Sequence, residues 1–283
     1  MLIQIMAAQL LIIYTVSSLL FVLYERQLSN TSDSKRQFGG GGVACLAIGA
    51  VLQIAFIREQ MSEGKPAFLD LQTSLSGLIV CWVGIGIFFI VKFRVYLMGI
   101  FVAPFACITS VAILLLPRFE ISAPIQLTSV FTGPGLIAHA SFGFLGYAAY
   151  FCATLGGGLY LIQNSLLKSK QFGVLFDHLS PLETAVKIMS VSLATGVVSF
   201  SLAVLSAVIF LRDTVSIDII IGDPIIDSIG ILWLYGLCLL LYTKKSSYSR
   251  KLTSYFSLFL GILVIVLRIL SGFVSGLHTF TST

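Results

Sequence analysis

The sequence predicts an all-α membrane protein, a polytopic bundle of eight transmembrane helices with both chain termini on the periplasmic side. Three observations predict this fold. First, 57% of the 283 residues are hydrophobic, only 10% are charged, and the mean hydropathy is +1.02; such a composition excludes a soluble globular domain. Second, apolar runs recur at the length that a helix needs to cross about 30 Å of hydrocarbon. Third, Lys and Arg are distributed unevenly between alternate loops.

The apolar runs give the helices in order. The first run has neither a charged leading region nor a small-residue cleavage site, so we expect a retained span and not a removed signal peptide. The second is the shortest, because it opens with four glycines. We expect spans at 2–24, 41–57, 71–91, 95–116, 136–163, 185–211, 225–242 and 252–277.

The connections divide the chain into two predicted domains. Residues 1–135 form an N-terminal membrane half of four helices that ends in an outer loop, and residues 136–283 form a C-terminal half of four helices. The outer loop 117–135 contains three prolines, so we expect it to be extended or to hold only a short helix. The stretches 25–42 and 164–184 read as polar connections.

The orientation follows from the basic residues. Loops after odd-numbered spans contain eleven Lys and Arg residues and loops after even-numbered spans contain four, which predicts that the odd loops are cytoplasmic. The net charge of +5 therefore reflects this asymmetry, and no nucleic-acid partner is expected. The eleven are Arg26, Lys35, Arg36, Lys92, Arg94, Lys168, Lys170, Lys244, Lys245, Arg250 and Lys251; the four are Arg58, Lys65, Arg118 and Arg212.

Two of the three histidines fall on one predicted membrane face. His139 opens the fifth span and His278 closes the eighth, both on the outer side, whereas His178 lies on the opposite face. Neutral imidazole is a common metal ligand, and two imidazoles can hold a haem iron from opposite sides within an apolar, aromatic wall. The pattern allows two interpretations: a haem site, or two histidines that prefer the headgroup boundary.

Two charged residues near the outer face allow a similar choice. Arg268 is a basic residue in the outer half of a span, where a charge needs a partner or a polar cavity. Asp227, near the outer start of the seventh span, is its expected structural partner. The functional interpretation is that Arg268 meets an acidic group of a ligand, such as a haem propionate.

Two further motifs concern helix structure. In "SPLET", Ser180 as N-cap, Pro181 at the first helical position and Glu183 predict a capping box. In "LGGGLYL", residues 155–161, small residues predict close packing between helices. No GxSxG, HExxH or phosphate-binding loop occurs, so we expect no enzyme activity.

Longer stretches of the C-terminal half carry a family resemblance. "HASFGFLGYAAYFCATLGGGLYLIQNSLLK", "LSPLETAVKIMSVSLATGVVSFSLAVLSAVIF" and the terminal "SGLHTF" resemble the cytochrome c assembly protein family, the membrane haem handlers of the CcsA, CcmC and HemX type. The likeness covers roughly residues 136–280 and is most specific at four points. These are His139 with Tyr147 eight residues later, the "LSPLET" helix start, Thr195-Gly196 in the sixth span and the terminal "SGLH".

The resemblance implies a function and its site. In that family a pair of outward-facing histidines binds haem during its delivery to apocytochrome c, and His139 and His278 match those positions. Tyr147 and Arg268 are further candidate haem contacts. The family's tryptophan-rich outer loop is absent, because the chain has "SIDIIIGDP" there. The pattern is most similar to the eight-helix HemX-like and YpjD-like branch of bacterial inner-membrane proteins.

The resemblance predicts an accessory factor for cytochrome c assembly, with haem, maturation proteins or apocytochrome, and the lipid bilayer as partners. Two alternatives remain open at this point. One is a membrane scaffold that regulates haem biosynthesis through its cytoplasmic loops. The other is a transporter of a small solute, with Arg268 and Asp227 along its path.

Overall fold

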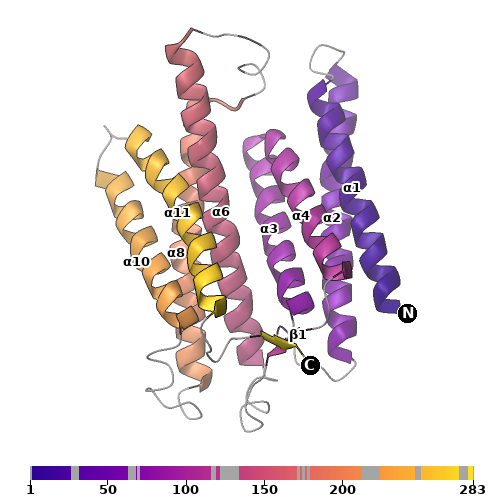
Figure 1. Ribbon diagram of the computed structural model, residues 1–283. Coiled ribbons are helices and arrows are strands. Elements are labelled where there is room, and N and C mark those ends of the chain that lie inside the picture. The colour runs from indigo at the N-terminus through magenta and orange to yellow at the C-terminus, as the bar shows by residue number, and fades with distance from the viewer. Residues whose placement is uncertain are drawn as a thin grey trace. The chain divides into compact units, whose positions relative to one another are not determined.

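The computed structural model describes most of the chain as long helices (Figure 1). Eight of the helices among the described residues are long and apolar enough to cross a membrane, which confirms the predicted multi-pass, all-α fold. The side of the membrane on which the termini lie stays a prediction. The structure describes residues 2–26, 32–62, 68, 71–115, 119–121, 134–170, 173, 176, 179–211, 224–245, 250–273 and 280–282.

The chain divides into two compact units, of which the first contains most of the N-terminal helices. It comprises Met1–Lys65, Leu75–Pro117 and Gln163–Thr184. Within it α1 packs along both α2 and α4, and Trp82 of α3 donates a hydrogen bond from its indole N–H to the backbone carbonyl of Val102 in α4 (3.2 Å). The helices are α1 (Leu2–Arg26), α2 (Ser32–Ser62), α3 (Leu71–Phe93) and α4 (Leu97–Leu115).

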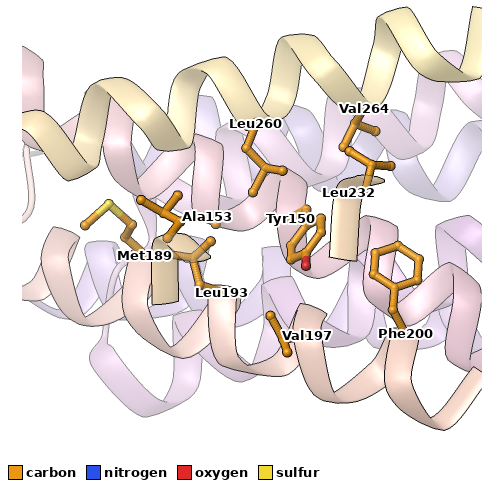
Figure 2. Packing of buried hydrophobic residues seen from close by; sticks show 10 residues of the cluster. Tyr150, Ala153, Met189, Leu193, Val197, Phe200, Leu232, Leu260 and Val264 are labelled. Atoms are coloured by element: carbon orange, nitrogen blue, oxygen red, sulfur yellow. The ribbon is translucent and has the colours of Figure 1, made fainter. Parts of the chain in front are cut away.

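The second unit comprises Pro66–Ser74, Arg118–Ile162 and Ala185–Thr283. Its core surrounds Tyr150, which is fully buried (Figure 2). Side chains from four helices, among them Leu193, Leu232 and Leu260, enclose the tyrosine ring. The elements are β1 (Phe119–Ile121), α6 (Pro134–Lys168), α8 (Leu182–Leu211), α10 (Pro224–Lys245), α11 (Arg250–Phe273) and β2 (Phe280–Ser282).

The close helix packing predicted for "LGGGLYL" is confirmed. A Cβ at Gly156 would lie 2.8 Å from the backbone nitrogen of Met189 in α8, and a Cβ at Gly157 would lie 2.9 Å from the carbonyl oxygen of Ser254 in α11. Helix α6 therefore meets two neighbours at backbone distance, and adjacent glycines serve the two contacts.

The predicted start of the second span differs from the structure. Helix α2 begins at Ser32, so much of the predicted polar connection 25–42 is helical. Glycine disfavours a helix by about 1 kcal/mol per residue relative to alanine, but Gly39 and Gly42 pack against aromatic rings of neighbouring helices, and this tertiary packing offsets the cost. At the other end of the chain, α11 is described over Arg250–Phe273, and residues 274–277 of the predicted span lie outside the described residues.

The predicted capping box is wrong in its hydrogen bond. Helix α8 does begin at Leu182, directly after Ser180 and Pro181. The Ser180 hydroxyl, however, is buried and has no hydrogen-bond partner among the described residues. The first turn instead closes through a backbone bond from the Thr184 N–H to the Pro181 carbonyl (2.8 Å). Proline at the helix start, and not the serine side chain, accounts for this N-terminus.

Candidate functional site

His139 lies in the second turn of α6 and faces α8. Its Nδ1 is 2.8 Å from the backbone carbonyl oxygen of Ala203. A carbonyl oxygen can only accept a hydrogen bond, so Nδ1 carries the ring proton in this contact and the lone pair of the neutral ring lies on Nε2. A backbone carbonyl that holds Nδ1–H is the usual arrangement behind a histidine that ligates a metal through Nε2.

The Ala203 carbonyl is itself part of a small polar group in α8. Ala203 is buried, and the Ser206 hydroxyl, also buried, donates to the same carbonyl oxygen (2.8 Å). The imidazole of His139 is only half-buried. Its ring is thus fixed on one side by the helix neighbour and reaches the surface of the unit on the other.

Tyr147 also faces α8, eight residues after His139. Its ring meets the ring of Phe200 edge-on, with 5.2 Å between the centroids. Gly146 makes room for Phe200, since a Cβ there would lie 2.9 Å from the phenyl ring. The structure therefore brings His139 and Tyr147 to the same helix interface, where Tyr147 contributes packing.

The short sheet ties the C-terminal segment to the residues that precede α6. β1 and β2 pair antiparallel, with Phe119 opposite Ser282 and Ile121 opposite Phe280. In Figure 1 this pair lies at the end of the second unit where α6 begins and α11 ends. His278 precedes β2 by two positions in the sequence, but it lies outside the described residues.

Helix α11 buries a polar stripe. Thr253, Ser254 and Ser257 are buried, whereas Tyr255, Phe256 and Phe259 are exposed. The exposed apolar face suits lipid, and the hydroxyl face lies inside the unit. Helix α11 therefore has an exposed apolar face and a buried face that contains these three hydroxyl groups.

Arg268 belongs to the backbone of α11, but its side chain lies outside the described part of the structure. It follows Val264, a buried residue of α11, by four positions, which is about one helical turn. Asp227 is exposed in the first turn of α10. The pairing of these two residues stays a prediction.

Among the described residues, His139 has the chemistry of a haem ligand. No group of three or more His, Cys, Asp or Glu side chains that could hold a metal ion occurs within the described ranges. Haem iron needs at most two axial ligands from the protein, because the porphyrin supplies the other four. An imidazole with its Nδ1–H held by a carbonyl meets the requirement for one of them.

Sequence reasoning missed the partners that orient His139. Ala203 and Ser206 belong to an apolar span, and a backbone acceptor leaves no residue-type signal in the sequence. The histidine could be found from the sequence, and its hydrogen bond could not.

Comparison with known proteins gives no support for a family. No protein-family model matches the sequence, and neither curated proteins nor solved structures give a match. The resemblance to the cytochrome c assembly family stays a prediction.

Proposed function

We propose that the chain is a haem-binding or haem-handling protein of the bacterial inner membrane, an accessory factor in cytochrome c assembly that uses His139 and His278. One observation carries the proposal: the hydrogen bond between Nδ1 of His139 and the Ala203 carbonyl, which leaves Nε2 as the basic nitrogen of a half-buried ring. Three further features are compatible with it: the aromatic packing at Tyr147, the tie between β1 and β2, and the predicted outward face of both histidines.

Each candidate residue would have a separate role in haem binding. His139 and His278 would hold the haem iron, and Arg268 would meet a propionate. Haem would supply a redox-active iron as a cofactor or would pass through as cargo for apocytochrome. The protein residues bind and orient, and no covalent step is assigned to any of them. The contact between the Tyr147 and Phe200 rings would hold α6 against α8 near His139.

The test is the visible absorption spectrum of the detergent-purified protein, oxidised and reduced, with and without added haem. We expect a spectrum typical of two imidazole ligands in the parent and its loss in His139→Ala and in His278→Ala. His178→Ala is the matched control, because it removes the third histidine and should leave the spectrum unchanged.

A second variant separates coordination from folding. Ser206→Ala removes a hydroxyl that shares the Ala203 carbonyl but leaves the His139 contact in place, so haem binding should persist. A protein that folds but takes up no haem, or one whose spectrum survives His139→Ala, contradicts the proposal. Either result would favour the alternative, a scaffold that regulates haem synthesis.

A small-solute transporter is the second candidate, and the buried hydroxyl stripe of α11 favours it. Ser257 is fully buried, and its hydroxyl makes no hydrogen bond within the described part of the chain. For a transporter, Ser257→Ala and Arg268→Gln should abolish flux of the solute in vesicles whether or not haem is bound. For a haem handler, Ser257→Ala should leave the spectrum intact.

A further inference from the structure

One end of the first unit combines a tyrosine pair with exposed basic side chains. Tyr24 in the last turn of α1 and Tyr96 directly before α4 lie with their ring centroids 4.7 Å apart and their planes tilted by 35°. Arg26 ends α1 and is exposed. Lys92 and Arg94, at the end of α3 and just after it, are also exposed. The two tyrosines therefore join the ends of helices that carry these positive charges.

The two tyrosines also pack against α2. Gly39 of α2 lies beneath it, since a Cβ there would come within 2.8 Å of the Tyr96 ring and 3.1 Å of the Tyr24 ring. Both tyrosines are half-buried, so each has one part packed and another part near the surface. Tyrosines in such a position are typical of the boundary between hydrocarbon and lipid headgroups.

Arg94 has a backbone conformation that favours glycine. Its φ angle is 55°, in the left-handed region, at the position directly after a helix where glycine is most common. Lys170, just past the end of α6, has the same φ angle of 55°. Two helices are thus followed by a basic residue in a backbone conformation where glycine would be less strained.

No protein partner uses these charges within the described residues. The side chains of Arg26, Lys92 and Arg94 form no hydrogen bond or ion pair with any described residue. Glu25 lies beside Arg26, is half-buried and has an interaction of its own. The three exposed cations therefore have no anionic partner among the described residues, which makes them candidates for binding an anion from outside the chain.

The apolar surface beside the basic residues favours a lipid over a free anion. Directly before the basic residues, Val22 and Leu23 of α1 and Val91 of α3 are exposed apolar side chains. A ligand that places a phosphate against the cations and a hydrocarbon chain against these residues matches both surfaces. A free phosphate ion would use only the first.

We propose that Arg26, Lys92 and Arg94, together with the pair Tyr24 and Tyr96, form a binding site for the phosphate headgroup of an anionic phospholipid. The guanidinium groups suit the phosphodiester oxygens, and the tyrosines mark the headgroup depth. The charge asymmetry of the loops predicts this end to be cytoplasmic, where anionic lipids attract basic residues near the ends of helices. The site is independent of the proposed haem site.

Arg94→Gly gives the sharpest test, because it removes the charge and relieves the backbone at once. The measurement is binding of a fluorescent short-chain phosphatidylglycerol to the purified full chain in zwitterionic detergent, with the thermal midpoint recorded beside it. We expect Arg94→Gly to keep or raise the thermal midpoint while phosphatidylglycerol binds about fivefold more weakly, the loss that one basic residue accounts for. Arg26→Gln should weaken binding similarly.

Arg58→Gln is the matched control, since Arg58 is an exposed arginine near the other end of α2 and should leave binding unchanged. Inorganic phosphate and phosphatidylcholine are the competing ligands, and neither should displace the probe. Unchanged binding in both Arg94→Gly and Arg26→Gln, or equal loss in Arg58→Gln, would overturn the proposal. Displacement by inorganic phosphate would overturn it too, because the site would then be one for a free anion.

Discussion

The two units use glycine in different ways to bring their helices together. In the first unit, the packed glycines meet side chains: a Cβ at Gly42 would touch the ring of Phe21 at 2.9 Å, and one at Gly49 would touch the ring of Tyr14 at 2.5 Å. Phe21 and Tyr14 are fully buried in α1. Gly42 and Gly49 are thus recesses for aromatic rings, and these rings lie between the helix backbones.

In the second unit, two glycines meet backbone atoms instead. Gly156 approaches the Met189 nitrogen and Gly157 approaches the Ser254 carbonyl, so no side chain separates α6 from α8 or from α11 at this level. A ring can turn or shift by a few tenths of an ångström, whereas a helix backbone moves only with the whole helix. The difference teaches that α6 is fixed in place more strictly than α1, and α6 is the helix that carries His139.

The largest effect is expected at the three consecutive glycines of α6. Gly156→Ala and Gly157→Ala should each lower the free energy of unfolding by about 1 to 3 kcal/mol, because the added methyl group must push a neighbouring helix away. Gly158→Ala is the matched control: its Cβ would meet only the Leu258 side chain at 3.6 Å, an ordinary contact. There we expect no loss, or a gain of up to about 1 kcal/mol from helix propensity.

Thermal unfolding in detergent measures all three variants under one condition. Equal changes in stability for Gly156→Ala and Gly158→Ala would contradict the comparison between the two units. They would mean that the backbone contact of α6 yields to a methyl group as easily as a side chain does. The same variants carry information on the haem proposal, because a displaced α8 would also displace the Ala203 carbonyl from His139.

A smaller effect is expected where the second unit does use a ring. A Cβ at Gly236 of α10 would fall on the Tyr150 hydroxyl oxygen and would lie 2.6 Å from the ring carbon Cζ. That hydroxyl is buried and has no hydrogen-bond partner among the described residues. Gly236→Ala should cost about 1 to 2 kcal/mol, and Tyr150→Phe should restore part of the loss by removing the oxygen.

A double-mutant cycle in the same thermal assay checks this. Tyr150→Phe alone should leave stability unchanged or raise it slightly, because it removes an unsatisfied buried hydroxyl. A Tyr150→Phe variant that loses stability on its own would show that the hydroxyl has a partner such as a bound water. Additive losses in the double variant would show that the Gly236 methyl group meets something other than this oxygen.

The fold could be predicted from hydropathy because a membrane allows few alternatives to an apolar helix. All eight spans were located by length and composition, and "LGGGLYL" indicated close packing. The start of α2 could not be predicted, because four glycines read as a connection until the rings of Phe21, Tyr24 and Tyr96 are known to cover two of them. Contacts between distant helices decide such an end, and local composition does not contain them.

The candidate site could be predicted only in part for the same physical reason. His139 stands out in a span that is poor in polar residues, so its residue type alone was a signal. The tautomer depends on the Ala203 carbonyl in another helix, 64 residues away. The basic residues Arg94 and Lys170 were counted in the sequence for orientation, but their left-handed backbone is a property of the folded turn.

The smallest effects are expected in the glycine run of α2, where neighbouring positions differ in one respect. Gly42→Ala should cost about 1 kcal/mol, because Phe21 must shift but only a side chain is in the way. Gly40→Ala should raise stability by up to about 1 kcal/mol, since no atom lies within 4 Å of its Cβ position and alanine favours the helix. Phe21→Leu should reduce the Gly42→Ala cost by giving the methyl group space. A Gly42→Ala loss as large as that of Gly156→Ala would mean that the ring of Phe21 is as immobile as a backbone, since it also fills the recess at Gly99, and the two units would then be closed by equally rigid contacts.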